Sequence, residues 1–182
     1  MKQYLARCTF FLCALFLAGC HEEAAITATP PEPASTATAV SLFSRTCAAS
    51  LPGFNDVPAR AKAAGMVPAG TIGPIRQAQR LPRQLLVVGF VDSRVGRICA
   101  FVVDSNDDPA RLGQEILKAA RKVAGSGREK RYPSSFYEYA IRLSNGSLLT
   151  QDSREKGGAR NRSIFFLSAP ISEDQVPYLI YD

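Results

Sequence analysis

Few residues of this 182-residue chain have side chains suited to covalent chemistry. His21 is the only histidine, and tryptophan is absent. A serine, threonine or cysteine nucleophile needs an adjacent general base, and histidine is the usual one in such pairs. His21 lies in an Ala-, Thr- and Pro-rich segment that we interpret as a solvated linker, and a lone histidine is a poor metal site. We therefore expect no enzymatic activity, no metal and no cofactor.

One acidic segment has the spacing of a calcium-binding loop. Asp104, Asn106 and Asp108 together with Glu115 match positions 1, 3, 5 and 12 of an EF-hand loop. Position 6, where that loop needs glycine for a sharp turn, is Pro109. We therefore interpret the segment as the end of a strand followed by a capped helix.

The whole chain carries a formal net charge of +6. In its second half, basic residues form two clusters. The first cluster is Lys118, Arg121, Lys122, Arg128, Lys130 and Arg131. The second cluster is Arg154, Lys156, Arg160 and Arg162. If the two converge in space, they would suit phosphate groups of envelope lipids or an acidic protein. The alternative interpretation is that these cations lie on a solvated helix face and in a surface loop. The membrane tether that the N-terminal residues predict, described below, argues against nucleic acid as a partner.

The N-terminal residues have the form of an export signal. Lys2 and Arg7 precede an apolar run from Cys8 to Gly19, which is shorter than the roughly 20 residues of a membrane-spanning helix. The run ends in Leu17-Ala18-Gly19-Cys20, which resembles the lipobox of bacterial lipoproteins. This resemblance implies cleavage before Cys20 and acylation of that residue with fatty acids such as palmitate. His21, in place of Asp, favours the outer membrane by the rule of that class, with the protein facing the periplasm.

The resemblance divides the chain into three parts. Residues 1–19 are the expected signal peptide, and residues 20–40 are the lipidated cysteine and an Ala/Thr/Pro-rich tether. Residues 41–182 are expected to form a single α+β domain. The tether has no aromatic residue and no Lys or Arg, and its prolines favour extended backbone.

Two further cysteines remain in the expected domain. Cys47 has the four-residue spacing of an apolar helix face with Phe43 and Leu51, whereas Cys99 alternates in phase with Phe101 of a strand. In an oxidising compartment such a pair forms a structural disulfide. A redox dithiol is typically a Cys-x-x-Cys motif, which this pair is not.

Local signals predict the helices. Besides the short helix that carries Cys47, residues 57–64 have Pro58 in the first turn, and residues 109–124 are preceded by Asp108 and followed by Gly125. The long helix presents one apolar stripe, which consists of Leu112, Ile116, Ala119, Ala120 and Val123.

Strands are predicted from alternating or wholly apolar runs at residues 84–92, 97–104, 136–144, 147–151 and 163–168, with an edge strand at 178–181. Asn145-Gly146 predicts a hairpin turn. Residues 66–83 contain three prolines and two glycines, so we interpret them as an irregular connection. The prediction is an α+β fold with a mainly antiparallel sheet of about five strands, helices packed on one face, and the order α-α-β-β-α-β-β-β.

This order, with one cysteine on the first helix and the other on the second strand, is loosely similar to an uncharacterised family of small exported proteobacterial proteins. The similarity covers about residues 43–150 and implies no activity. Our leading hypothesis is a membrane-tethered periplasmic binding module, such as an inhibitor or immunity protein against a toxin. The alternative is an envelope assembly or maintenance factor that contacts anionic lipid or cell wall. A hydrolase that uses a carboxylate pair is the third.

Overall fold

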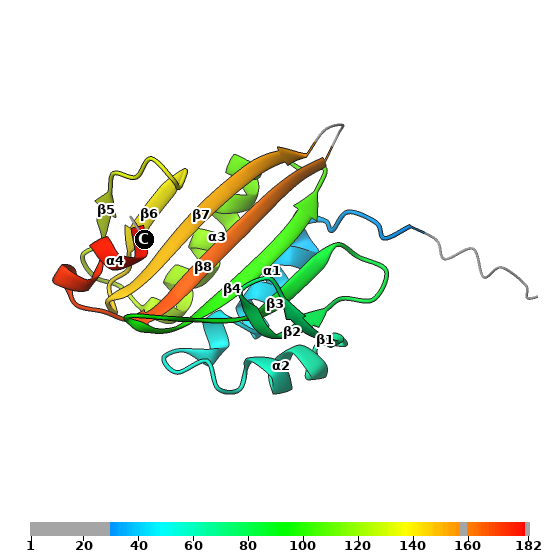
Figure 1. Cartoon of the computed structure of the whole chain (residues 1–182). Helices are drawn as coiled ribbons and strands as arrows, with labels where there is room; N and C mark the ends of the chain where they lie inside the picture. Colours follow the sequence, from blue (N-terminus) through cyan, green and yellow to red (C-terminus); the bar gives the residue numbers. More distant parts are fainter. Residues whose placement is uncertain (1–29, 157–159, 181–182) are drawn as a thin grey trace, which may run out of the picture.

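The centre of the protein is a single antiparallel sheet (Figure 1). A computed structural model describes residues 30–156 and 160–180, with residues 154–156 described by their backbone alone. Within these residues eight strands pair in the order β1-β2-β3-β4-β8-β7-β6-β5, and every neighbouring pair is antiparallel. The strands are β1 (Val67–Ile72), β2 (Ile75–Arg80), β3 (Leu86–Ser93), β4 (Gly96–Ser105), β5 (Lys130–Tyr132), β6 (Tyr139–Arg142), β7 (Ser147–Lys156) and β8 (Arg160–Pro170).

The two longest helices cover one face of this sheet. They are α1 (Thr36–Arg45) and α3 (Pro109–Ala124), which contact each other behind the strands (Figure 1). The shorter α2 (Val57–Ala63) contacts β2 and β3. A 3-10 turn at Ala48–Ser50 follows α1, and another at Glu173–Gln175 precedes α4 (Pro177–Ile180) near the end of the chain.

The sheet is larger than the predicted one, and the element order is different. Residues 66–83 form the hairpin β1–β2 instead of an irregular connection, and the short strand β5 follows α3. The predicted edge strand at 178–181 is wrong, because Pro177–Ile180 is helical. The five-strand prediction is thus corrected to eight strands. Prolines and glycines led to the error: Pro68 is tolerated because β1 is an edge strand, and Gly70, at φ +75°, lies between two register shifts.

The main core lies between the sheet and the helices. Phe43 of α1 meets Phe101 of β4 edge to face, with ring centroids 5.6 Å apart, and Phe165 of β8 follows at 6.5 Å. The predicted disulfide between Cys47 and Cys99 is confirmed, and both residues are fully buried in this core. The cross-link therefore joins the segment after α1 to a central strand.

The helix α3 confirms its predicted bounds. The Asp108 carboxylate accepts a hydrogen bond from the Ala110 N–H, and Gly125 follows with φ +82°. Four of the five stripe residues are buried, whereas Val123 is 48% exposed near the end of the helix. A Cβ atom at Gly113 would overlap the Gln151 side chain, so glycine allows this helix to lie close to β7.

Folded structure begins before residue 41, the predicted start of the domain. The Glu32 and Ala34 N–H groups donate to the Arg83 and Asp104 carbonyls, at 2.8 and 2.9 Å. The helix α1 starts at Thr36, whose N–H and hydroxyl both donate to the Asp107 carboxylate. These two bonds lower the pKa of Asp107, with the hydroxyl as the larger cause. The last residues of the predicted tether are thus part of the fold.

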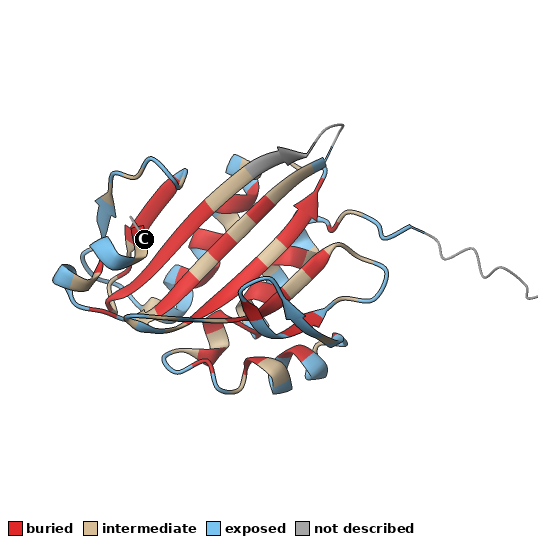
Figure 2. Cartoon of the chain, in the orientation of Figure 1, coloured by how far each residue is buried: buried red, intermediate tan, exposed pale blue. Residues whose placement is uncertain are grey.

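The second face of the sheet is only partly covered. At one end β2 folds over β3, where a Cβ atom at Gly89 would overlap the Ile75 side chain and the Arg76 carbonyl. At the other end Ile171, Val176 and Ile180 pack on β6 and β7. Between these two ends, buried and intermediate residues alternate along the middle of β8 (Figure 2). A stretch of partly apolar sheet is therefore left open between the β1–β2 hairpin and the C-terminal segment.

Candidate functional site

The first basic cluster is largely engaged with nearby acceptors. Arg121 contacts Glu129 at 2.7 Å, and Lys130 contacts Glu173 at 2.9 Å. Hydrogen bonds from these cations lower the pKa of both carboxylates. The remaining members are Lys118, 3.9 Å from Glu115, the exposed Lys122 and Arg128, and Arg131, which donates to the Glu138 carbonyl. Nearby glutamates therefore offset part of the positive charge that the sequence suggested for this surface.

The second basic cluster lies on the β7–β8 hairpin. Arg162 donates from Nε and Nη2 to the two carboxylate oxygens of Asp104, at 2.5 and 2.8 Å. Arg160 is exposed, whereas the side chains of Arg154 and Lys156 lie outside the described part of the structure. Since the Asp104 carboxylate is 8% exposed, Arg162 acts first as the counter-ion of a buried acid.

The two clusters do not form one surface. Lys130 is opposite Arg142, which pairs with Leu148 near the start of β7, whereas Arg154 pairs with Arg162 near the end of β7. The six residue steps from Leu148 to Arg154 span about 20 Å of strand. Binding of an anion or a partner by either cluster stays a prediction for each cluster separately.

The acidic segment that resembles a calcium loop serves the fold. Asp104 pairs with Arg162, Asp107 holds the start of α1, and Asp108 caps α3. Within residues 30–156 and 160–180, no group of three or more His, Cys, Asp or Glu side chains is placed to hold a metal ion.

A cleft lies on the open face of the sheet. It has a volume of about 640 Å³, within the range of small-molecule sites. It lies between the β3–β4 turn and the C-terminal segment, and its lining is mixed aliphatic, aromatic and hydroxyl-bearing. The lining residues are Val91, Asp92, Ser93, Arg94, Ile98, Tyr137, Leu148, Thr150, Phe166, Ser168, Tyr178 and Leu179.

Strand register places the floor of the cleft. Ile98 of β4 is opposite both Val91 of β3 and Ser168 of β8, and Phe166 of β8 is opposite Thr150 of β7. These residues share the open face because neighbouring side chains of a strand alternate between faces. The Phe101 and Phe165 side chains therefore point to the helices, while the residues beside them form the cleft.

One wall of the cleft is aromatic. Tyr137 meets Phe166 edge to face at 6.5 Å, with an angle of 77° between the ring planes. Burial raises the pKa of the Tyr137 hydroxyl, and the nearby Asp152 carboxylate adds to this effect. Tyr178 of α4 is 51% exposed and completes the lining on this side.

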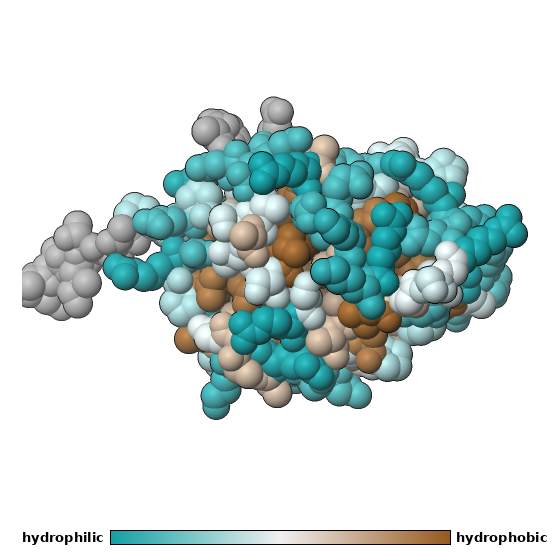
Figure 3. All heavy atoms as spheres, turned by 180° about the vertical axis from the view of Figure 1, so that it is seen from behind, coloured by the Kyte–Doolittle hydropathy of each residue, from teal (hydrophilic) through white to brown (hydrophobic). Residues whose placement is uncertain are grey.

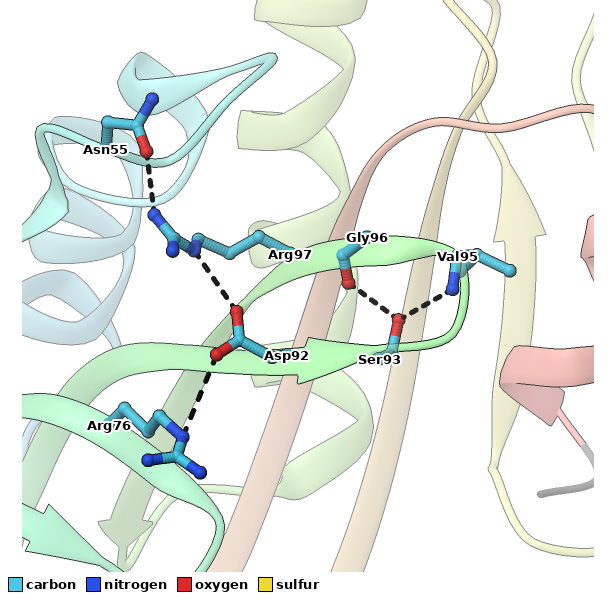
Figure 4. Close-up of polar contacts among 7 residues, drawn as sticks. All are labelled: Asn55, Arg76, Asp92, Ser93, Val95, Gly96 and Arg97. Carbon is cyan, nitrogen blue, oxygen red and sulfur yellow. Dashed lines mark hydrogen bonds and ion pairs between the residues drawn. The ribbon is translucent and has the colours of Figure 1, made fainter.

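Beside the β3–β4 turn, two guanidinium groups that do not line the cleft contact one carboxylate (Figure 4). The Asp92 carboxylate lies 3.4 Å from Arg97 Nε and 3.7 Å from Arg76 Nε. Arg97 also donates to the Asn55 side chain at 2.7 Å and lies over the Phe90 ring. These contacts hold the β1–β2 hairpin and the segment before α2 against the turn.

The turn itself is fixed by a side chain of the lining. Ser93 Oγ donates to the Gly96 carbonyl at 2.7 Å and accepts from the Val95 N–H at 3.3 Å (Figure 4). This leaves Arg94, a lining residue, in the centre of a defined turn. The polar side of the cleft is therefore built from a structured turn.

Two hydroxyl groups at the floor differ in their hydrogen bonding. Ser168 Oγ accepts from the Leu148 N–H and donates to the Ala169 carbonyl. Thr150 is 3% exposed, and its Oγ1 has no hydrogen-bond partner among the described residues. A buried hydroxyl without a partner is costly to the fold.

The sequence prediction missed this site. The run at residues 84–92 could have indicated it, because this run is apolar on both faces. In an antiparallel sheet one face is often solvated, so a second apolar face points to a surface that is covered or binds something. The residues that line the cleft come from several strands, from a turn and from the helix α4, which was predicted to be a strand. Only the tertiary structure brings them together. The opposite surface, seen in Figure 3, is mainly hydrophilic with scattered apolar areas.

Comparison of the chain with protein-family models, curated proteins and solved structures finds no match. The similarity to a family of exported proteins therefore stays a prediction. In the described residues no helix has the length and apolar character needed to cross a membrane. The lipobox-like motif, Cys20 and His21 lie outside the described residues.

Proposed function

We propose that the protein is a non-catalytic binding module, tethered to a membrane through Cys20 and facing the periplasm, whose binding site is the open-face cleft. The cleft is the observation that carries this proposal, because a concave, mostly apolar site with a few polar groups is typical of ligand recognition. The described cysteines are joined in a disulfide, so they supply no nucleophile.

The shape of the site favours an envelope component over a protein as the ligand. A stable protein interface buries about 800 Å² of each partner, which is more than a cleft of this kind offers by itself. A single small molecule, in contrast, fills a volume of 640 Å³ well. The site therefore supports the envelope-factor hypothesis more directly than the inhibitor hypothesis.

Inhibition of a toxin is the second candidate function. The observation that favours it is the edge strand β1, where Val67 and Ile72 are 37% and 42% exposed. Apolar side chains on an unpaired edge suit contact with another protein. In that case Ile72→Glu should abolish capture of the partner, whereas variants of the cleft should leave it unchanged.

A tryptophan reporter tests the cleft as a binding site. The chain has no tryptophan, so Leu179→Trp places a single reporter in the lining. In nanodiscs of phosphatidylcholine, we expect the emission of the full-length variant to shift to shorter wavelength when a polar-lipid extract of a Gram-negative envelope is added, because the ligand excludes water. The matched control is Val123→Trp, a half-exposed position on α3, which should not respond. If both variants respond equally, or if neither responds, the cleft is not the binding site.

Replacement of Cys20 tests the tether. In cells given radiolabelled palmitate, we expect label in the wild-type protein and its recovery in the membrane fraction. Cys20→Ser should lose the label completely, because the thiol that receives the diacylglyceryl group is gone. Equal labelling of both proteins, or unlabelled wild-type protein in the soluble fraction, would refute the lipid tether.

A further inference from the structure

The segment that forms the β1 edge of the sheet carries positive charge only. Residues 57–91, which include α2 and the β1–β2 hairpin, contain no Asp or Glu. Their basic residues are Arg60, Lys62, Arg76, Arg80 and Arg83. Acids just outside the segment pair with two of them: Asp56 contacts Arg60, and Asp92 contacts Arg76. The other three cations are exposed and form no ion pair with a carboxylate that the structure describes.

Three exposed cations lie around the start of β1. Arg80 of β2 is directly opposite Val67, so the two side chains share one face of the sheet. Lys62 is part of α2, which contacts both strands of the hairpin (Figure 1). Arg45 of α1 donates to the Ala63 carbonyl at the end of α2, at 3.5 Å, and pairs with no described carboxylate. We call these three cations and Val67, which is 37% exposed, the β1 patch.

The backbone of β1 is poorly suited to pairing with a further strand. Pro68 has no N–H group to donate, and register shifts on both sides of Gly70 interrupt the regular spacing of the strand. Features of this kind protect sheet edges from strand addition. A partner at this edge would therefore contact the side chains of the β1 patch rather than extend the sheet.

The composition around the β1 patch favours a protein over a lipid surface as the occupant. Residues 55–80 contain no aromatic residue, whereas Trp and Tyr are the side chains enriched where proteins contact membrane interfaces. An exposed apolar side chain surrounded by charged groups has instead the arrangement of a protein interface, with an apolar centre and a polar rim. Guanidinium groups bind carboxylates through two parallel hydrogen bonds, so the rim complements an acidic surface.

We infer that the β1 patch binds an acidic protein, which covers Val67 with an apolar contact and pairs its carboxylates with Arg45, Lys62 and Arg80. None of these four residues lines the cleft, so the patch is a second site beyond the proposed function. For the toxin-inhibitor candidate, it adds the chemistry of the partner to contact at the β1 edge. An anionic membrane surface is the competing occupant.

Photo-crosslinking in cells that produce the full-length protein tests the occupant. The photoreactive residue p-benzoylphenylalanine replaces Val67, and the control places it at Val123, a half-exposed position on α3. We expect position 67 to cross-link to one protein, at a site that mass spectrometry maps to a segment with an excess of Asp and Glu. A phospholipid adduct, a partner segment without such an excess, or no more cross-linking than from position 123 would overturn the acidic protein partner. The Leu179→Trp reporter tests the cleft separately, so the two sites can fail independently.

A matched pair of charge reversals tests the cations of the patch. Arg80→Glu should lower the cross-linking yield from position 67 about fivefold, because like charges then face each other across the interface. The control is Arg111→Glu, which changes the net charge of the chain equally at an exposed position on α3 and should leave the yield unchanged. Replacing acids of the mapped partner segment by Lys should restore cross-linking to the Arg80→Glu protein. Equal losses in both variants, or no restoration by the charge swap, would refute specific pairing at the β1 patch.

Discussion

Removal of the Cys47–Cys99 cross-link should lower the free energy of unfolding by about 4 kcal/mol. The two cysteines are separated by 52 positions, and a cross-link over a loop of this length limits the conformations of the unfolded chain. Net stabilities of domains are about 5–15 kcal/mol, so this loss is a large part of the total. Urea denaturation of Cys47→Ala/Cys99→Ala, followed by circular dichroism, measures this loss.

Reduced wild-type protein is the control for the lost sulfur atoms. It retains both side chains in the core, where each is fully buried, and lacks only the bond between them. We expect it to lose most of the same free energy as the double alanine variant. If the reduced protein unfolds at the same urea concentration as the oxidised one, the cross-link does not contribute as the chain-entropy argument requires.

Replacement of Arg162 by methionine should destabilise the protein by about 3 kcal/mol. The Asp104 carboxylate is 8% exposed and receives two hydrogen bonds from this guanidinium, so Arg162→Met leaves a buried charge without its counter-ion. The same bonds raise the pKa of Arg162, which keeps its charge. Urea denaturation at neutral pH gives the free-energy difference.

Removal of both charges is the informative control. Asp104→Leu/Arg162→Met replaces the ion pair by apolar side chains, and we expect its stability to lie within about 1 kcal/mol of the wild type. A double variant that is as unstable as the single one would show that the pair itself is required. Arg160→Met, an exposed neighbour on β8, should change stability by less than about 0.5 kcal/mol.

Elements with strong local signals were predicted well. The helix α3 has Asp108 before it and Gly125 after it, and its bounds agree with the prediction. The β3–β4 hairpin and the turn at Asn145-Gly146 are also confirmed, with Gly146 at φ +90°. Capping and tight turns depend on neighbouring residues, so they can be inferred from a short stretch of sequence.

Elements that depend on distant partners were missed. The strand β1 contains Pro68 and Gly70 and has no alternating apolar pattern, yet it pairs with β2 at the sheet edge. The strand β5 has three residues and exists because β6 lies beside it. By composition, the residues of α4 fit a strand as well as a helix. In the structure they are helical, and Ile180 packs in one cluster with Ala140 and Leu148. Propensity over such short segments is a weak guide.

The sequence by itself determined the cysteine pair, the capped helix α3, the antiparallel α+β class and the motif from which a lipid tether is inferred. These features follow from residue types that constrain the backbone or the chemistry over a few positions. The tertiary structure alone decided that the two basic clusters lie at opposite ends of β7, that Arg162 neutralises a buried acid, and that a cleft forms on the open face. Pairing of charges and closure of a cleft require residues far apart in the chain to meet, and strand register, which sets those meetings, is a property of the whole sheet.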